Sequence, residues 1–181
     1  VIFIIIFLHQ IKNNKMKNYI TEFIGTFFLV FTIGLTATED LASLAPVAIG
    51  TMLMVMVYMG GHISGAHYNP AVSMAMIIRG LLSVKEAIKY ILSQLSGAIL
   101  AVLLVNWLSE SILELLPMKV GPNPNVSPIQ ILIVEAIFTF ALVLVILNVA
   151  TNPKTEGNSY YGLAIGFTIM AAAFAGGGIS G

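Results

Sequence analysis

The residues whose types and spacing could do chemistry lie in one segment, Gly61–Val72, which directly follows an apolar run. The segment combines glycines, two histidines, an asparagine and a proline. Lipid cannot satisfy free backbone groups, so at membrane depth protein or water must surround such a segment. It therefore predicts a pore or a solute site. Asn69 is a good helix N-cap and Pro70 fits a first helical turn, so a short helix should start there.

Two carboxylates, those of Glu22 and Glu135, stand within apolar stretches. Ionisable residues inside a membrane segment are costly and are functional candidates by default. Such a pair could relay protons, which gives one hypothesis, a proton-coupled secondary transporter. The sequence offers no nucleophile–base arrangement, metal cluster or phosphate loop, so no enzyme is predicted.

The composition indicates a polytopic membrane protein. The 181 residues are 58% hydrophobic and 9% charged, with a mean hydropathy of +0.97, whereas a soluble domain carries roughly 25% charged residues. The net charge is zero, so nucleic acid is not an expected partner. The chain has no cysteine, and its histidines, His9, His62 and His67, are too few and scattered for a zinc cluster. No cofactor is predicted.

Five membrane spans are predicted, at about Tyr19–Thr36, Leu44–Gly60, Lys85–Leu108, Ile129–Ala150 and Tyr160–Gly176. The piece Asn69–Arg79 is too short to cross a bilayer, which takes about 20 residues. We expect a loop at Ser109–Pro128. Residues 1–15 are interpreted as an upstream or disordered extension before Met16, because a signal peptide would place its charged region ahead of its apolar one.

Basic residues in short loops predict the orientation. The lysines before the first span, Arg79 with Lys85 and Lys89, and Lys154 fall on one side if Asn69–Arg79 re-enters without crossing. That side is expected to be cytoplasmic and to hold the N-terminus. The loop 109–128 is then extracytoplasmic.

The chain repeats itself. Glu22–Val30 matches Glu135–Val143 at an offset of 113, and Gly61–Gly65 matches Gly177–Gly181 at an offset of 116. Three spans separate the copies, and an odd number inverts the second copy, which places a solute path between the halves. We therefore expect a first repeat at 16–108 and an incomplete second repeat at 129–181, in a chain truncated at its C-terminus.

These motifs resemble those of the aquaporins, the major intrinsic protein family of water and glycerol channels. The resemblance rests on Gly61–Val72 and on the Glu-x-x-x-Thr openings of both halves, and it covers Met16–Gly181. It implies an all-α, inverted-repeat helical bundle with re-entrant half-helices, five of its six spans being present. It also implies a homotetramer, with one pore per subunit, in the lipid bilayer of the plasma or inner membrane.

The resemblance implies a role for each residue of the motif. Asn69, Pro70 and Ala71 form the pore motif, and the Asn69 amide donates hydrogen bonds to passing water. The extended backbone before it offers carbonyl acceptors, at Gly65, Ala66, His67 and Tyr68. The partial positive charge at the half-helix N-terminus repels cations and disfavours a proton-conducting water chain.

In the resembling family, the counterparts of Glu22 and Glu135 brace the irregular loops by accepting backbone N–H bonds. The symmetric placement of the two residues suits that role, which Thr26 and Thr139 could share; the relay stays open as the alternative. Gln94 on the third span is a further candidate for holding the loop. His67 could anchor the loop by a hydrogen bond, or gate the pore or sense pH. His62 is expected to be structural.

The resemblance also indicates a selectivity filter. Two of its four positions fall at Ile49 and Ala173, where a strict water channel usually has an aromatic residue and a histidine. An aliphatic and a small residue predict a wider, more apolar opening, and hence a passive channel for water and small neutral solutes such as glycerol. The remaining alternative is an inert product that lacks half of the pore.

Overall fold

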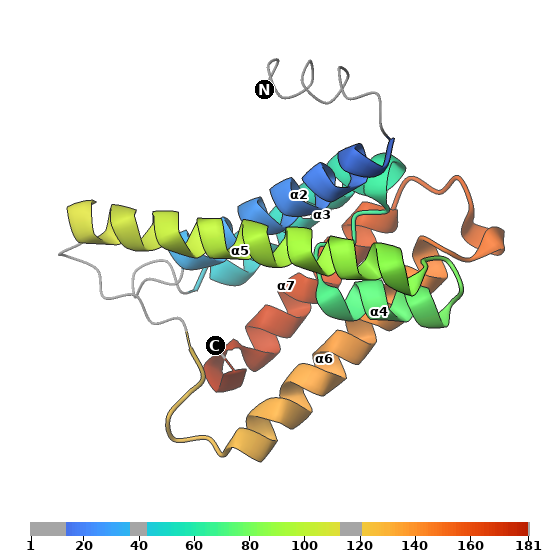
Figure 1. The fold of residues 1–181 in the computed structure, drawn as a ribbon. Coiled ribbons are helices and arrows are strands. Elements are labelled where there is room, and N and C mark those ends of the chain that lie inside the picture. Colours follow the sequence, from blue (N-terminus) through green and yellow to red (C-terminus); the bar gives the residue numbers. More distant parts are fainter. Residues whose placement is uncertain (1–13, 37–42, 113–120, 181) are drawn as a thin grey trace.

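The computed structural model describes residues 14–36, 43–112 and 121–180. Within these ranges the chain is helical, with no strand (Figure 1). The elements are α2 (Asn14–Thr36), α3 (Ala45–Ser64), α4 (Pro70–Ile78), α5 (Val84–Ile112), α6 (Pro128–Val149), the 3-10 turn η1 (Pro153–Thr155) and α7 (Tyr161–Ser180). All but α4 and η1 are long and apolar enough to cross a membrane. The predicted fold class, an all-α multi-pass membrane protein, is confirmed.

The helices extend beyond several predicted bounds. Asn14 and Lys15, expected in the N-terminal extension, already belong to α2, and the rest of that extension lies outside the described residues. α3 was expected to end at Gly60 but continues through Ser64, and α7 continues past Gly176 to Ser180. Backbone hydrogen bonding inside a bundle overrides the weak helix propensity of glycine.

The connection between α5 and α6 was predicted at 109–128. α5 continues to Ile112, so the first four residues of that expected loop are helical. Residues 113–120 lie outside the described residues. Pro128 opens α6 at N1, and Ser127 forms a reciprocal capping box with Gln130.

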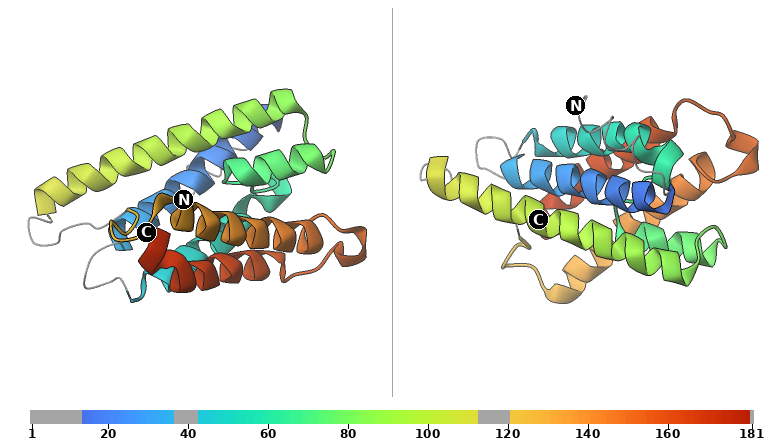
Figure 2. Two further views of the ribbon diagram at one scale, coloured as in Figure 1. Left: turned by 90° about the horizontal axis from the view of Figure 1, so that it is seen from below. Right: turned by 45° about the horizontal axis from the view of Figure 1, so that its top comes forward.

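Five long helices and the short α4 build the described part of the bundle (Figures 1 and 2). α2 packs against α5, α6 packs against α7, and α3 packs against both α2 and α7 and so joins these two pairs. α4 lies against α5 and α6. Gly97 of α5 approaches α2 so closely that a Cβ there would meet the carbonyl group of Phe23. Small residues permit such close approach between membrane helices.

The internal repeat recurs in the helix bounds. α3 and α7 each have 20 residues, and both ends of the two helices lie 116 positions apart. A Cβ on Gly50 would lie 2.7 Å from the carbonyl oxygen of Gly166, and a Cβ on Gly166 would lie 2.5 Å from that of Gly50. The other close neighbours, Met170 and Met54, are again 116 apart. Equivalent residues thus contact one another across an approximate two-fold axis, as inverted repeats do.

The start of α2, the α4–α5 connection and the α6–α7 connection lie at one end of the bundle (Figure 1). All three contribute to one cavity, through Asn18, Leu81 with Leu82, and residues 149–153 and 155–158. α4 has nine residues and is therefore only about 14 Å long. It follows a buried loop and returns to the same end, so it is re-entrant. Lys85 and Lys154 accordingly lie at one end.

Replacing Gly166 by alanine should separate α3 from α7, because the added Cβ would lie 2.5 Å from the carbonyl oxygen of Gly50. Overpacking of this kind costs about 1–3 kcal/mol. We expect a lower unfolding temperature in detergent. Gly178→Ala is the matched control, since a Cβ at Gly178 meets nothing within 4 Å. Equal stability of the two variants would contradict this packing.

Candidate pore site

The loop between α3 and α4 is irregular and mostly buried. Gly65 ends α3 with φ 89°, and its N–H donates to the Gly61 carbonyl. Ala66 and Tyr68 also have positive φ, 52° and 49°, which non-glycine residues seldom adopt. The prediction of an extended backbone before Asn69 is therefore wrong at Gly65, Ala66 and Tyr68, where left-handed conformations turn the chain sharply inside the protein. Such strain persists only where surrounding structure holds it.

The Glu22 carboxylate holds this loop. Glu22 is completely buried on α2. Its Oε1 accepts hydrogen bonds from the Ser64 hydroxyl at 2.6 Å and from the His67 N–H at 3.0 Å. Its Oε2 accepts from the Tyr68 N–H at 2.8 Å and from the Gln94 amide at 2.8 Å. Donors to an ionised carboxylate make hydrogen bonds roughly twice as strong as neutral ones.

A second set of contacts joins the loop to α4 and α5. The Gln94 amide also donates to the Ser73 hydroxyl at 3.1 Å, and Ser73 Oγ lies 3.1 Å from His67 Nδ1. The Tyr90 hydroxyl donates to the Ser64 carbonyl at 2.9 Å. The polar network thus connects α2, α4, α5 and the loop.

The Tyr68 side chain fixes the other side of the loop. Its hydroxyl donates to the Met56 carbonyl at 2.9 Å. Its ring occupies the space that a Cβ would need at Gly25 of α2 and at Gly60 of α3. These two glycines therefore make room for the aromatic ring, which is 2% exposed.

Asn69 caps α4 as predicted. Its side-chain oxygen accepts from the Ala71 N–H at 2.8 Å, and Pro70 is the first residue of the helix. The capping bond uses the amide oxygen, so the Asn69 NH2 group remains as a donor. That group forms no hydrogen bond with the described residues.

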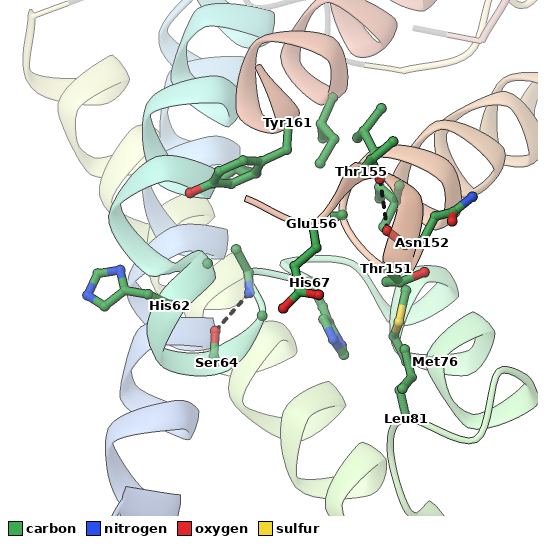
Figure 3. A pocket seen from close by; sticks show the side chains of 18 of the residues that line it. His62, Ser64, His67, Met76, Leu81, Thr151, Asn152, Thr155, Glu156 and Tyr161 are labelled. Carbon is green, nitrogen blue, oxygen red and sulfur yellow. Dashed lines mark hydrogen bonds between the residues drawn. The ribbon is translucent and has the colours of Figure 1, made fainter. Parts of the chain in front are cut away.

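A cavity of about 770 Å³ opens beside the loop (Figure 3). Gly65, Ala66 and His67 belong to its lining, as do parts of α3, α6 and α7. The carbonyl oxygens of these three residues accept no hydrogen bond from the described part of the chain. Tyr68 and Asn69 do not belong to the lining.

The other predicted site residues lie apart from this network. Glu135 is exposed on α6 and forms no hydrogen bond with the described residues, and Thr139 is half-buried on the same helix. The buried Thr26 hydroxyl has no partner, so it does not hold the loop. Ile49 and Ala173 are half-buried, in parts of α3 and α7 away from the cavity lining.

His62 also lies apart from the loop network. It is exposed and belongs to the cavity lining, with its ring turned away from the middle of the cavity in Figure 3.

Sequence reasoning missed Ser73 and Tyr90. Tyr90 and Gln94 lie one turn apart on α5, so a common face with Gln94 was the available signal for Tyr90. Ser73 had no such signal, because its partners come from the loop and from another helix.

The family model described as Major intrinsic protein matches residues 9–181. The chain belongs to the major intrinsic protein family. Members of this family are channels, so the chain is not an enzyme.

Two curated relatives show what kinds of family member this chain is similar to. Aquaporin NIP1-2 of Arabidopsis thaliana is 35% identical over 92% of this chain and 60% of its own length. Glycerol uptake facilitator protein-like 6 of Lactiplantibacillus plantarum is 40% identical over 85% of this chain and 72% of its own length. The chain thus spans less than two thirds of the plant relative.

A solved structure has the same fold. The aquaglyceroporin from Plasmodium falciparum superposes with a TM-score of 0.79 at 25% sequence identity, covering 92% of this chain and 75% of that one. The inverted-repeat bundle with its re-entrant half-helix is therefore the fold of this family.

Glu22→Gln should loosen the loop, because a glutamine amide offers an NH2 group where the Tyr68 N–H and the Gln94 amide need an acceptor. Losing charge-assisted bonds in a buried site costs about 3 kcal/mol. We expect a lower unfolding temperature in detergent. Glu156→Gln, the same change at an exposed carboxylate, should leave the temperature unchanged. If both variants unfold alike, the loop does not depend on Glu22.

Proposed function

We propose that this protein acts as a passive transmembrane channel for water and small neutral solutes such as glycerol, closed to ions and protons. The observation that carries the proposal is the irregular loop before α4. It is mostly buried in a membrane bundle, yet residues 65–67 line a cavity and their carbonyl groups accept no hydrogen bond from the described residues. Such groups can replace the hydration of a solute that carries hydroxyl groups.

The Asn69 amide supplies the matching donor. Its oxygen is engaged by Ala71, which leaves its two N–H donors for a solute. A solute with hydroxyl groups, or water itself, can accept from Asn69 and donate to the carbonyl groups. This pairing suits neutral molecules that both donate and accept.

The α4 N-terminus supports the exclusion of cations and protons. A helix N-terminus carries about half a positive charge, and one aimed at a water path raises the energy of a cation there. The charge lies where the cap residue Asn69 meets the loop.

A proton-coupled transporter is less consistent with the geometry of Glu22. A relay residue must exchange its proton with water, but Glu22 is completely buried and does not belong to the cavity lining. Both of its oxygens are already engaged by donors from the protein. We therefore assign Glu22 a bracing role. For Glu135, which is exposed and forms no hydrogen bond with the described residues, the internal repeat alone supports proposing the equivalent role on α6.

Glycerol is proposed as a solute on two grounds. Ile49 and Ala173, at the positions matched to the family's narrowest point, would give a wide and apolar opening. One relative is named a glycerol uptake facilitator and the superposed structure is an aquaglyceroporin. We further propose that the protein lies in the plasma or inner membrane, that its N-terminus is cytoplasmic and that it forms a homotetramer.

The purified protein in liposomes should speed both osmotic water flow and glycerol uptake over empty vesicles. Asn69→Asp separates pore chemistry from folding, since aspartate caps a helix as well as asparagine does but offers no N–H donor. Losing a donor worth about 1 kcal/mol should slow flux about fivefold at unchanged stability. Glycerol uptake no faster than in empty vesicles would refute the wide-filter part.

A proton gradient across the same vesicles distinguishes a channel from a transporter. We expect glycerol uptake to be non-saturating and unchanged by the gradient, because Glu22, the candidate relay residue, is buried and both of its oxygens already accept hydrogen bonds from the protein. Saturable uptake that follows the gradient and disappears in Glu22→Gln would favour the transporter instead. Circular dichroism of that variant checks that the loss is not unfolding.

A further inference from the structure

The cavity beside the loop contains one carboxylate, that of Glu156. Among the described residues that line it, Glu156 is the one acidic residue, and none is a lysine or an arginine. Figure 3 shows the Glu156 side chain projecting from the α6–α7 connection toward the middle of the cavity. The carboxylate forms no hydrogen bond or ion pair with the described residues, so its charge is uncompensated by direct contact.

The connection that carries Glu156 is a built structure. The side chains of Asn152, Thr155 and Asn158 form hydrogen bonds with the backbone of the connection and of the last residues of α6, at distances between 2.6 and 3.1 Å. The Tyr58 hydroxyl of α3 donates to the Ser159 carbonyl at 2.8 Å and ties the connection to the bundle. The Glu156 backbone is therefore held at the cavity rim.

A second charge acts at the inner side of the cavity. Residues Gly65–His67 line it and lead into Asn69, where α4 starts. The N-terminus of α4 carries about half a positive charge, which repels cations but attracts anions. Taken alone, this helix would make the path favourable for small anions, so the exclusion of anions needs another source.

We propose that Glu156 is the anion-excluding residue of this channel: its carboxylate, which extends from the cavity rim toward the middle of the cavity, opposes the positive α4 N-terminus, so that anions are repelled before they reach Asn69. The two charges act in series with opposite signs. The rim admits cations and neutral solutes, and the α4 N-terminus stops the cations, so that neutral solutes pass. The inference rests on the proposed channel function for its role, but the sign of the cavity potential can be measured without any flux.

The chain contains no cysteine, so a single cysteine can report the local potential. Thr151 lines the cavity and is labelled in Figure 3. In Thr151→Cys, the rates of modification by a cationic and an anionic methanethiosulfonate of similar size are compared, each relative to its rate with a free thiol. Ala150, also in the lining, is the second reporter position if the first variant is unstable.

The cationic reagent should react preferentially. Adding Glu156→Gln should lower the cation-to-anion ratio about fourfold at low salt, because a unit charge several ångströms away changes each reagent's local concentration about twofold in water, in opposite directions for the two reagents. The difference should shrink in 1 M salt, where the screening length is about 3 Å. Lys154→Gln is the matched control, a charge change in the same connection at a residue outside the lining.

A ratio that Glu156→Gln leaves unchanged, or that Lys154→Gln shifts by as much, overturns the proposal. The result does not depend on transport. A protein that shows the Glu156-dependent ratio but passes neither water nor glycerol would refute the proposed function and leave the charge at the rim established. A protein that passes water and glycerol but whose reagent ratio does not depend on Glu156 would support the proposed function and refute the role of Glu156.

Discussion

The structure depends on one constraint, that backbone N–H groups at membrane depth need acceptors within the protein. The loop between α3 and α4 breaks helical hydrogen bonding inside the bundle, and Glu22 supplies the missing acceptor for His67 and Tyr68. A carboxylate can do this because it accepts several bonds at once, while its buried charge is compensated by the same donors. The positive φ values, the re-entrant α4 and the cavity beside the loop all follow from a loop held in this way.

The bracing of the backbone leaves a different set of groups for solute. The N–H groups of His67 and Tyr68 donate to Glu22, whereas the carbonyl groups of residues 65–67 have no partner among the described residues. The two polar groups of the Asn69 amide differ in the same way: its oxygen accepts the capping hydrogen bond from Ala71, and its NH2 group stays available to a solute. One network thus sets both the shape of the loop and the polarity that a solute meets.

Much of this site was predictable from residue types. Asn69 and Pro70 predicted the start of α4, and the cost of a buried carboxylate singled out Glu22. Ser73 and Tyr90 could not be found, because only the packing of α4 and α5 brings them to the loop. The end of α3 was misplaced because glycine and histidine at Gly61–Ser64 look like helix breakers, although the helix continues. Glu156 could not be singled out from the sequence, because nothing distinguishes it from other exposed carboxylates in loops.

The most direct test of the central claim is hydrogen exchange at the His67 and Tyr68 amides of the protein in lipid vesicles. Both residues lie in irregular backbone, and His67 lines the cavity, so without a strong acceptor their amides would exchange quickly. We predict protection comparable to that of amides in the middle of α3, because Glu22 holds both N–H groups. Exchange as fast as that of the exposed α6–α7 connection would contradict the account.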